Sequence, residues 1–460
     1  MELSYFHFGV LSIVCLTLVA LVYPKFNTYI YLGLIFFMPN TLAFGVKKGV
    51  EYISFYGAGT GLMVRPLISY YLLGLFFISL ILYRNHKSIL KQCRPAQIFI
   101  ILSAYYAIYA IGGIASGVPI NKVLSGSSAI HLVDMTLFII ILLRFCTDEK
   151  ELSRLTTFTI ACVFMIMCYG LIRYFFFGGD ISNVYSNIEG IKIKLTFQDI
   201  NDSLLACIVC YFCSWSLTNN WSNTSLRTKV FYIAVIALSI FTVLFSYRRS
   251  AWIGLCLAGV WFVFKQPMRR RIQVGIVFVV IATFMFTTLL TARLGQYEDK
   301  RSSVLFYDIN NKQGDIATKS GRFSELSWAF DTIKNNLIFG VGPWGTIGYR
   351  GNRDYMHGGV MQIWLKLGLI GITLFVLAIL FYITFCLTKY RKLPAGERGL
   401  FETGFAGLLF LLPTLCIGTP VIEYRTMQLL ALCLALPYII YAIKCGKNDQ
   451  AYNSPTNKTI

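Results

Sequence analysis

Residues 359–387 read GVMQIWLKLGLIGITLFVLAILFYITFCL, and Lys366 is the single charged residue in this apolar run. A bilayer core about 30 Å thick is crossed by roughly 20 apolar helical residues, so this stretch predicts a membrane-spanning helix. Similar runs recur along the 460 residues, which are 56% hydrophobic and only 13% charged. A soluble protein carries about 25% charged residues. The sequence therefore predicts an all-α polytopic membrane protein and excludes a soluble domain.

The apolar runs predict about 12 or 13 transmembrane helices, the total depending on the first two runs, which form the weakest pair. The predicted spans are 5–23, 28–45, 67–83, 97–115, 130–146, 156–177, 203–218, 230–246, 250–264, 272–291, 359–387, 400–418 and 426–443.

Lysine and arginine gather in three short loops, at 84–94, 265–271 and 389–398, which strict alternation puts on one side. Positively charged short loops stay cytoplasmic, so the opposite loops are predicted to face outward. The same rule accounts for most of the formal net charge of +20, and no nucleic-acid partner is expected. The loops predicted to face outward are 178–202, 247–249, 292–358 and 419–425.

These spans and loops divide the chain into four parts. They are an N-terminal transmembrane bundle (1–291), a large helical extracytoplasmic loop (292–358), C-terminal transmembrane helices (359–443) and a polar cytoplasmic tail (444–460).

Thirteen cysteines occur, almost all of them within apolar runs. Cys207, Cys210 and Cys213 follow one another at every third position, a spacing that resembles a cluster-ligand run. Their neighbours are apolar, and neither a histidine nor a second cysteine cluster completes a site. We interpret these cysteines as small buried hydrophobic residues and expect no metal site.

Arg248 and Arg249 form nearly the whole link between two predicted spans. An arginine at a helix end can snorkel to the interface without a further role. A consecutive pair on the outer face runs against the positive-inside tendency, and charge at the hydrocarbon boundary is costly. We therefore favour a functional role for this pair.

Arg322 falls in the first turn of a helix predicted within the outer loop, with Ser320 as its N-cap. A cation there opposes the helix dipole, whereas an anion could be bound by both the free N–H groups and the guanidinium. A solvated surface arginine is the alternative, and both interpretations stay open. The apolar stripe of this helix comprises Phe323, Leu326, Ala329, Phe330 and Ile333.

His357 stands where the outer loop re-enters the membrane, beside Gly358 and Gly359. An imidazole with an ordinary pKa near 6.5 can accept a proton from a hydroxyl at neutral pH. A lone interfacial histidine is more often structural, so this interpretation depends on the surrounding features. Asn201 and its neighbours in LTFQDINDSLLA precede another span, where capping of the helix is the simplest role.

Taken together, these segments resemble the O-antigen ligase/polymerase family of bacterial membrane glycosyltransferases. The matching segments are FQDIN (197–201), FSYRRSAWIGL (245–255), SGRFSELSWAFDTIKNNLIFGVGPWG (320–345) and the H-x4-Q-x5-G-x2-G run at 357–371. Their order and spacing fit over about 180 residues, whereas the N-terminal half matches in hydropathy alone. The family has His-Asn at His357-Gly358, Glu at Lys366 and Asn-Pro at Asn336-Leu337. These departures bear most on the acceptor side.

The resemblance implies transfer of a glycan from an undecaprenyl-diphosphate carrier to an acceptor hydroxyl, with inversion and with neither metal nor cofactor. It implies that Arg248, Arg249 and Arg322 bind the donor diphosphate, with Arg173 as a further candidate. Guanidinium groups suit this task because they meet the growing charge of a leaving diphosphate through paired hydrogen bonds.

By the same resemblance, His357 acts as the base on the acceptor hydroxyl, and Asn201 and Gln362 support the site. The implied location is the bacterial inner membrane, with the site facing the periplasm. The implied partners are the carrier-linked donor, a lipid A-core or glycan acceptor, and the bilayer. Metal-dependent transferases that use polyprenyl-phosphate sugars are disfavoured, because no Asp-x-Asp motif occurs and the first connecting loop, PKFNTY, lacks a carboxylate.

Two alternatives to O-antigen ligation onto lipid A-core stay open. A polymerase that extends the carrier-linked chain would use the same donor chemistry. A transporter of lipid-linked sugars would be expected to carry ionisable residues near the bilayer midplane and broken helices in repeated halves. Here the informative charges gather at the predicted outer boundary, and Asp134 and Glu423 lie near predicted outer helix ends.

Overall fold

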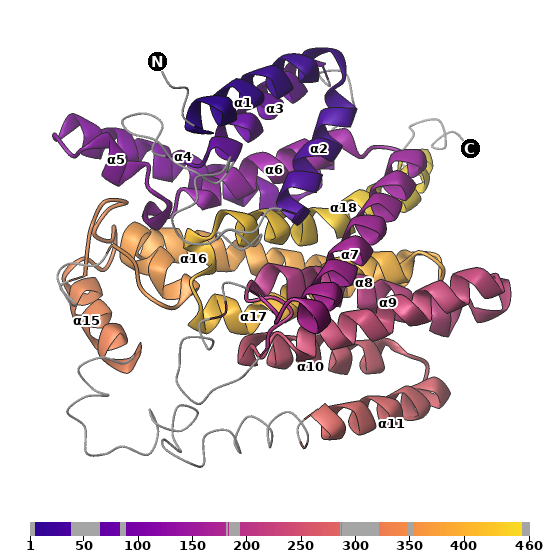
Figure 1. Cartoon of the computed structure of the whole chain (residues 1–460). Helices are drawn as coiled ribbons and strands as arrows, with labels where there is room; N and C mark the ends of the chain where they lie inside the picture. Colours follow the sequence, from indigo (N-terminus) through magenta and orange to yellow (C-terminus); the bar gives the residue numbers. More distant parts are fainter. Residues whose placement is uncertain are drawn as a thin grey trace, which may run out of the picture.

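The computed structural model describes residues 5–37, 65–82, 89–180, 183, 194–285, 287, 322–347 and 354–452. Within these ranges the chain is a bundle of helices (Figure 1). The α-helices are α1 (Tyr5–Val22), α2 (Pro24–Phe37), α3 (Leu67–Leu82), α4 (Arg94–Ala115), α5 (Ile120–Val123), α6 (His131–Phe145), α7 (Glu149–Phe176), α8 (Ile200–Asn219), α9 (Leu226–Leu244), α10 (Arg249–Lys265), α11 (Met268–Met285), α15 (Arg322–Asn335), α16 (Gly359–Lys389), α17 (Arg398–Ile417) and α18 (Tyr424–Tyr452).

Each predicted span overlaps one of these helices, although the ends of the spans predicted at 28–45 and 272–291 lie outside the described residues. Seven of the described helices are long and apolar enough to cross a membrane. The protein is therefore an all-α polytopic membrane protein. The short helix α5 had no counterpart among the predicted spans. At the other end of the chain, α18 continues to Tyr452, so the predicted polar tail begins as a helix.

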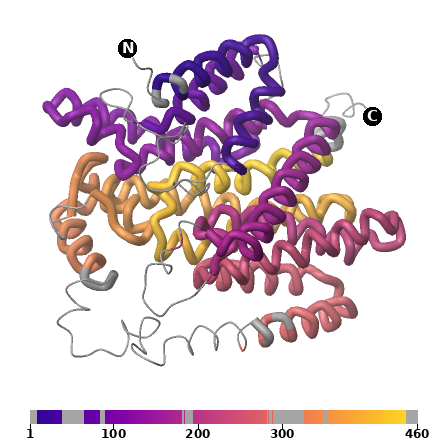
Figure 2. The backbone as a smooth tube through the Cα atoms, in the orientation of Figure 1, coloured from indigo at the N-terminus to yellow at the C-terminus, as the bar shows by residue number. Residues whose placement is uncertain are grey.

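The helices differ in how far they are enclosed by their neighbours. The most apolar window of α18 is 94% buried and those of α8 and α17 are 72% buried, whereas that of α9 is 22% buried. A helix that is apolar on every side and enclosed belongs to the core, and one that exposes apolar residues suits contact with lipid. Figure 2 shows α18, in yellow, running through the middle of the bundle.

Neighbouring helices in sequence do not always pack together. Helix α8 packs along α9 and α17, α18 packs along α6 and α17, and α4 packs along α16. Helix α10 packs along α17 and touches its sequence neighbour α9 much less. Helix α11 makes its main contact with α10 and lies at the edge of the bundle (Figure 1).

Several loops predicted to face outward meet at one end of the bundle. The Gly358 N–H donates to the Gly418 carbonyl at 2.6 Å, and the Thr196 N–H donates to the Phe245 carbonyl at 2.9 Å. These bonds join the loops before α16 and α8 to the ends of α17 and α9. Figure 1 shows α5, α15 and the first turns of α16 at this end.

Helix α16 is interrupted at Gly368, whose φ is +65°. The segment that follows α15 packs against this interruption, because the Val341 N–H donates to the Leu365 carbonyl at 2.8 Å and the Leu369 N–H to the Leu337 carbonyl at 2.9 Å. A Cβ on Gly368 would lie 2.1 Å from the Ile338 carbonyl oxygen, so this close approach requires glycine.

The buried side chain of Lys366 fixes the same segment. Its Nζ donates to the Pro343 carbonyl at 3.2 Å and to the Gly345 carbonyl at 2.5 Å. The Trp344 ring lies edge-on to the ring of Tyr109 on α4. The segment from Leu337 to Ile347 is thus held between α4 and α16, and this fixes where α15 ends.

Much of the predicted extracytoplasmic loop, including Ser320, lies outside the described residues, as do the last eight positions of the tail.

Candidate functional site

Arg248 and Arg249 occupy a tight, strained turn between α9 and α10. Tyr247 has a left-handed φ of +51°, a costly conformation for a residue with a side chain. The Trp252 indole N–H donates to the Val243 carbonyl at 3.2 Å and ties the first turn of α10 to the end of α9. The turn therefore presents two consecutive arginines at a fixed position on the bundle.

The two guanidinium groups lack an ion-pair partner within the described ranges. Arg248 is partly exposed, Arg249 is exposed, and no described carboxylate lies within ion-pair distance of either. The positive charge of Arg248 opposes the rise that burial causes in the pKa of the Glu423 carboxyl. Two cations held together in a rigid turn without a bound carboxylate are suited to binding an anion.

Glu423 lies in the connection between α17 and α18, which contains the short 3-10 helix η8 (Pro420–Ile422). Its carboxylate accepts hydrogen bonds from the Thr419 hydroxyl at 3.2 Å and the Thr426 hydroxyl at 2.7 Å. Burial raises the pKa of Glu423 above its ordinary value, and the neighbouring Asp199 adds to the rise, whereas Arg248 opposes it.

Arg425 neutralises the acids at the start of α8. Its guanidinium, which is 1% exposed, pairs with Asp199 at 3.1 Å and with Asp202 at 2.8 Å. It also donates to the carbonyls of Ile35 and Phe36 at the end of α2. One buried arginine thus links α2, α8 and α18 at this end of the bundle, as expected for a buried charge that must be fully paired.

Asn201, predicted to support the site, belongs to this group. Its side-chain amide donates to the Asp199 carboxylate at 2.7 Å, and Asp199 itself is the N-cap of α8. Asn201 is fully buried, and its amide oxygen accepts no hydrogen bond from the described residues. The predicted capping of α8 is therefore performed by Asp199, and Asn201 holds the capping carboxylate in place.

Arg173 lies close enough to Asp202 for their charges to interact. Its guanidinium is buried, pairs with Asp180 at 3.0 Å and donates to the Thr196 carbonyl. It also lies over the Phe197 ring, 4.6 Å from the centroid. The structure thus commits Arg173 to holding the loop before α8, in contrast to the exposed arginines of the α9–α10 turn.

His357 forms a close pair with Glu325. The His357 Nδ1 and a Glu325 carboxylate oxygen are 2.7 Å apart, and the carboxylate is 3% exposed while the imidazole is 33% exposed. A carboxylate that accepts the Nδ1–H leaves Nε2 as the basic nitrogen and stabilises the imidazolium formed when Nε2 takes a proton. The pair has the arrangement of a general base with an orienting acid.

The backbone around His357 is fixed by Gly358 and Gln362. Gly358 has a φ of +107°, and a Cβ there would lie 3.2 Å from the Cys416 carbonyl oxygen. The Gln362 side chain accepts from the Met356 N–H at 3.0 Å and donates to the Ser127 carbonyl at 2.8 Å. Gln362, predicted to support the site, therefore positions the residue before His357 against the connection that follows α5.

Arg322 is the first residue of α15, and Glu325 follows it by three residues, less than one helical turn. The side chain of Arg322 lies outside the described part of the structure. Helix α15 is anchored by part of its predicted apolar stripe, since Ala329 and Ile333 are buried with Ile347, Met356 and Leu365. Phe330 of the predicted stripe is instead 39% exposed, and the side chain of Phe323 lies outside the described part of the structure.

Three of the predicted residues, Arg248, Asn201 and His357, are linked to the connection between α17 and α18. Arg248 acts on Glu423 within this connection, and Gly358, next to His357, bonds to Gly418 at its start. Asn201 reaches the same group through Asp199.

The sequence interpretation missed Glu325, although a signal was present: Glu325, Ala329 and Ile333 are spaced by four and so share one face of α15. An acid on an otherwise buried helix face requires a polar partner.

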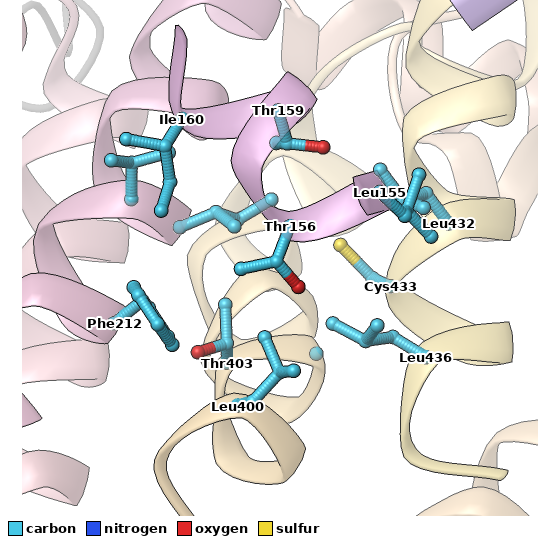
Figure 3. A pocket seen from close by; sticks show the side chains of 13 residues that line it. Leu155, Thr156, Thr159, Ile160, Phe212, Leu400, Thr403, Leu432, Cys433 and Leu436 are labelled. Atoms are coloured by element: carbon cyan, nitrogen blue, oxygen red, sulfur yellow. The ribbon is translucent and has the colours of Figure 1, made fainter. Parts of the chain in front are cut away.

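A second histidine–carboxylate pair among the described residues, His131 Nδ1 and Asp134 at 3.0 Å, is almost fully buried, and Arg65 also pairs with Asp134. The described residues contain no group of three or more His, Cys, Asp or Glu side chains that could hold a metal ion. A cavity of about 40 Å³ lies between α7, α8, α17 and α18 (Figure 3). Thr156 and Thr403 line it, but each hydroxyl donates to a carbonyl of its own helix. The cavity lies near the starts of α7 and α17, at the opposite end from His357.

The family model described as O-Antigen ligase matches residues 234–376, which run from α9 through the first half of α16 and include the arginine turn, α15 and His357. No curated protein matches the chain.

Proposed function

We propose that the chain, which belongs to the O-antigen ligase/polymerase family, transfers a glycan from an undecaprenyl-diphosphate carrier to an acceptor hydroxyl. The proposed reaction is O-antigen ligation onto lipid A-core at the periplasmic face of the bacterial inner membrane. Residues 1–291 and 359–443 then form the membrane bundle, 292–358 the periplasmic part and 444–460 the cytoplasmic end.

The observation that carries this proposal is the pairing of two features at one connection. The rigid turn of Arg248 and Arg249 supplies cations without carboxylate partners in the described structure, and the His357–Glu325 pair supplies a base. Both lie beside the α17–α18 connection. Transfer from a lipid diphosphate needs an anion site and a base close together, and these features are suited to the two tasks.

The reaction proceeds as a single displacement. The acceptor oxygen attacks the anomeric carbon while the bond from that carbon to the diphosphate oxygen breaks. His357 Nε2 takes the hydroxyl proton, and Glu325 stabilises the resulting imidazolium. Because the acceptor enters opposite the leaving group, the anomeric configuration inverts.

The leaving diphosphate carries the electron pair of the broken bond, and its charge is met by Arg248, Arg249 and Arg322. Arg322 lies at the N-terminus of α15, where free backbone N–H groups also favour an anion. Arg173, already bonded to Asp180, shapes the loop before α8 rather than contacting the donor. No metal is needed, because the guanidinium groups neutralise the developing charge.

The decisive experiment uses purified full-length protein in detergent, a carrier-linked glycan donor and lipid A-core acceptor, without an ion gradient and with EDTA present. Inverted glycosidic product on lipid A-core is expected. His357→Ala should lower kcat by about 10²- to 10⁴-fold, the usual contribution of a general base.

His7→Ala, at an exposed position of α1, is the matched control and should keep full activity. Product that stays on the carrier would identify a polymerase, and no product without a gradient would favour a transporter. Full activity of His357→Ala would remove the base assignment.

A further inference from the structure

A cavity of about 220 Å³ lies between α8, α9, α10 and α11, and its walls are almost wholly apolar. It is lined mainly by α10 (Leu255, Cys256, Ala258, Gly259, Phe262 and Val263), with Cys207, Cys210, Tyr211 and Ser214 of α8, Ile236 and Ile240 of α9, and Val274, Val277, Phe278 and Ala282 of α11. No charged side chain lines it. An apolar cavity of about 150 Å³ is large enough to hold benzene, so this one has room for a short stretch of hydrocarbon chain.

The packing of the helices explains why the cavity exists. Helices α9 and α10 are joined by the Arg248–Arg249 turn, but α9 packs along α8 whereas α10 packs along α17. The two helices therefore diverge below the turn. Helix α11 closes the opening incompletely, since its main contact is with α10 alone among the described helices.

Arg249, one of the proposed diphosphate ligands, lies over one edge of the cavity wall formed by α10. Arg249, Cys256 and Val263 are spaced by seven residues, nearly two helical turns each, so their side chains share one face. At about 1.5 Å per residue, Cys256 lies about 10 Å and Val263 about 21 Å below Arg249 along the helix. An amphiphile bound through its head at Arg249 would therefore direct its tail along the cavity.

We propose that this cavity binds the polyisoprenoid tail of the donor carrier, near its diphosphate end. This inference rests on the proposed function, because the arginine turn must hold the diphosphate for the tail to enter here. Each buried methylene adds roughly fourfold to affinity, so a few isoprene units contribute substantially to donor binding. The cavity thus lets the protein distinguish a carrier with a long tail from a short one and holds the anomeric carbon at a fixed depth.

The test compares the undecaprenyl donor with one of two isoprene units, both carrying the same glycan. Wild-type protein should show a KM at least about tenfold lower for the long donor. Cys256→Trp fills the cavity and should raise KM for the long donor by about tenfold or more, while the short donor and kcat change less than about twofold.

Leu257→Trp is the matched control, because Leu257 is the next residue of α10, is 37% exposed and does not line the cavity. It should behave as wild type with both donors. Equal KM values for the two donors in wild-type protein, or an unchanged long-donor KM in Cys256→Trp, would overturn the proposal.

A binding measurement covers the case in which Cys256→Trp does not fold or the proposed function fails. Undecaprenyl diphosphate without a glycan, carrying a photoreactive group on its second isoprene unit, should label α10 and α11 of wild-type protein. Unlabelled undecaprenyl diphosphate should compete, and phosphatidylethanolamine should not. Equal competition by both would mean that ordinary lipid fills the cavity and would overturn the tail assignment. Labelling without glycan transfer from either donor would refute the proposed function but leave the tail site standing.

Discussion

Glu325 is the residue that most strengthens the proposed role of His357. Its carboxylate is almost fully buried and lies 2.7 Å from His357 Nδ1, so it fixes both the orientation and the tautomer of the ring. His357 and Gln362 could be predicted because they occupy a motif in a short stretch of sequence. The acids at the start of α8 and their partner Arg425 could not be paired in advance, because 223 residues separate Asp202 from Arg425.

Glu325→Gln should lower kcat by about tenfold to a hundredfold, because the amide orients His357 without stabilising its charged form. The measurement is steady-state transfer with varied acceptor, in which the acceptor KM should change little. Asp331→Asn, at an exposed acid of the same helix, is the control. Equal losses in both variants would indicate a general effect on α15.

Arg322→Lys should lower kcat/KM for the donor by about tenfold or more, because an ammonium group cannot make the paired hydrogen bonds of a guanidinium. Arg270→Lys provides the comparison, since Arg270 bonds to the Thr218 carbonyl near the opposite end of the bundle. Wild-type kinetics in Arg322→Lys would show that Arg322 does not contact the diphosphate.

Among the elements, α16 departs most from its prediction. The sequence predicts one continuous span over 359–387, and hydropathy places the ends of the helix well because apolar content is a local property. The interruption at Gly368 depends on Leu337–Gly340 arriving from the outer loop to bond with it. Hydropathy is calculated from neighbouring residues and cannot predict such a contact between distant segments.

Gly368→Ala should lower the midpoint of thermal unfolding in detergent by several degrees and reduce activity, because the added Cβ meets the Ile338 carbonyl and φ is positive. Gly112→Ala, on α4, adds a Cβ that meets nothing within 4 Å and should leave the midpoint unchanged or slightly higher. A Gly368→Ala midpoint equal to that of wild type would contradict the strain described for α16.

On the scale of the whole molecule, the described ion pairs lie near the two ends of the bundle, with Arg425–Asp202 at one end and Lys265–Glu402 at the other, and many apolar side chains are exposed on its sides. Composition was sufficient to predict this membrane architecture, because a low charge content and long apolar runs indicate helices that are surrounded by lipid. Composition carries no comparable information about the acceptor, since ligation and polymerisation differ in which hydroxyl enters the same site.

Deletion of the gene should cause long carrier-linked glycan to accumulate while surface glycan is lost, because ligation consumes the carrier-linked chain. Electrophoresis of extracted glycolipids measures both pools. Loss of the long carrier-linked chains themselves would instead identify the polymerase reaction.

Arg425 has a further consequence for biogenesis. Arg425 is synthesised more than 200 residues after Asp199 and Asp202, so these carboxylates have no guanidinium partner from Arg425 until then. A nascent chain released by the ribosome before α18 would leave two acids at the rim of α8 without their guanidinium and two carbonyls of α2 without their donor. Without α18 these buried polar groups stay unpaired, so premature termination should yield a destabilised product that membrane proteases recognise and remove.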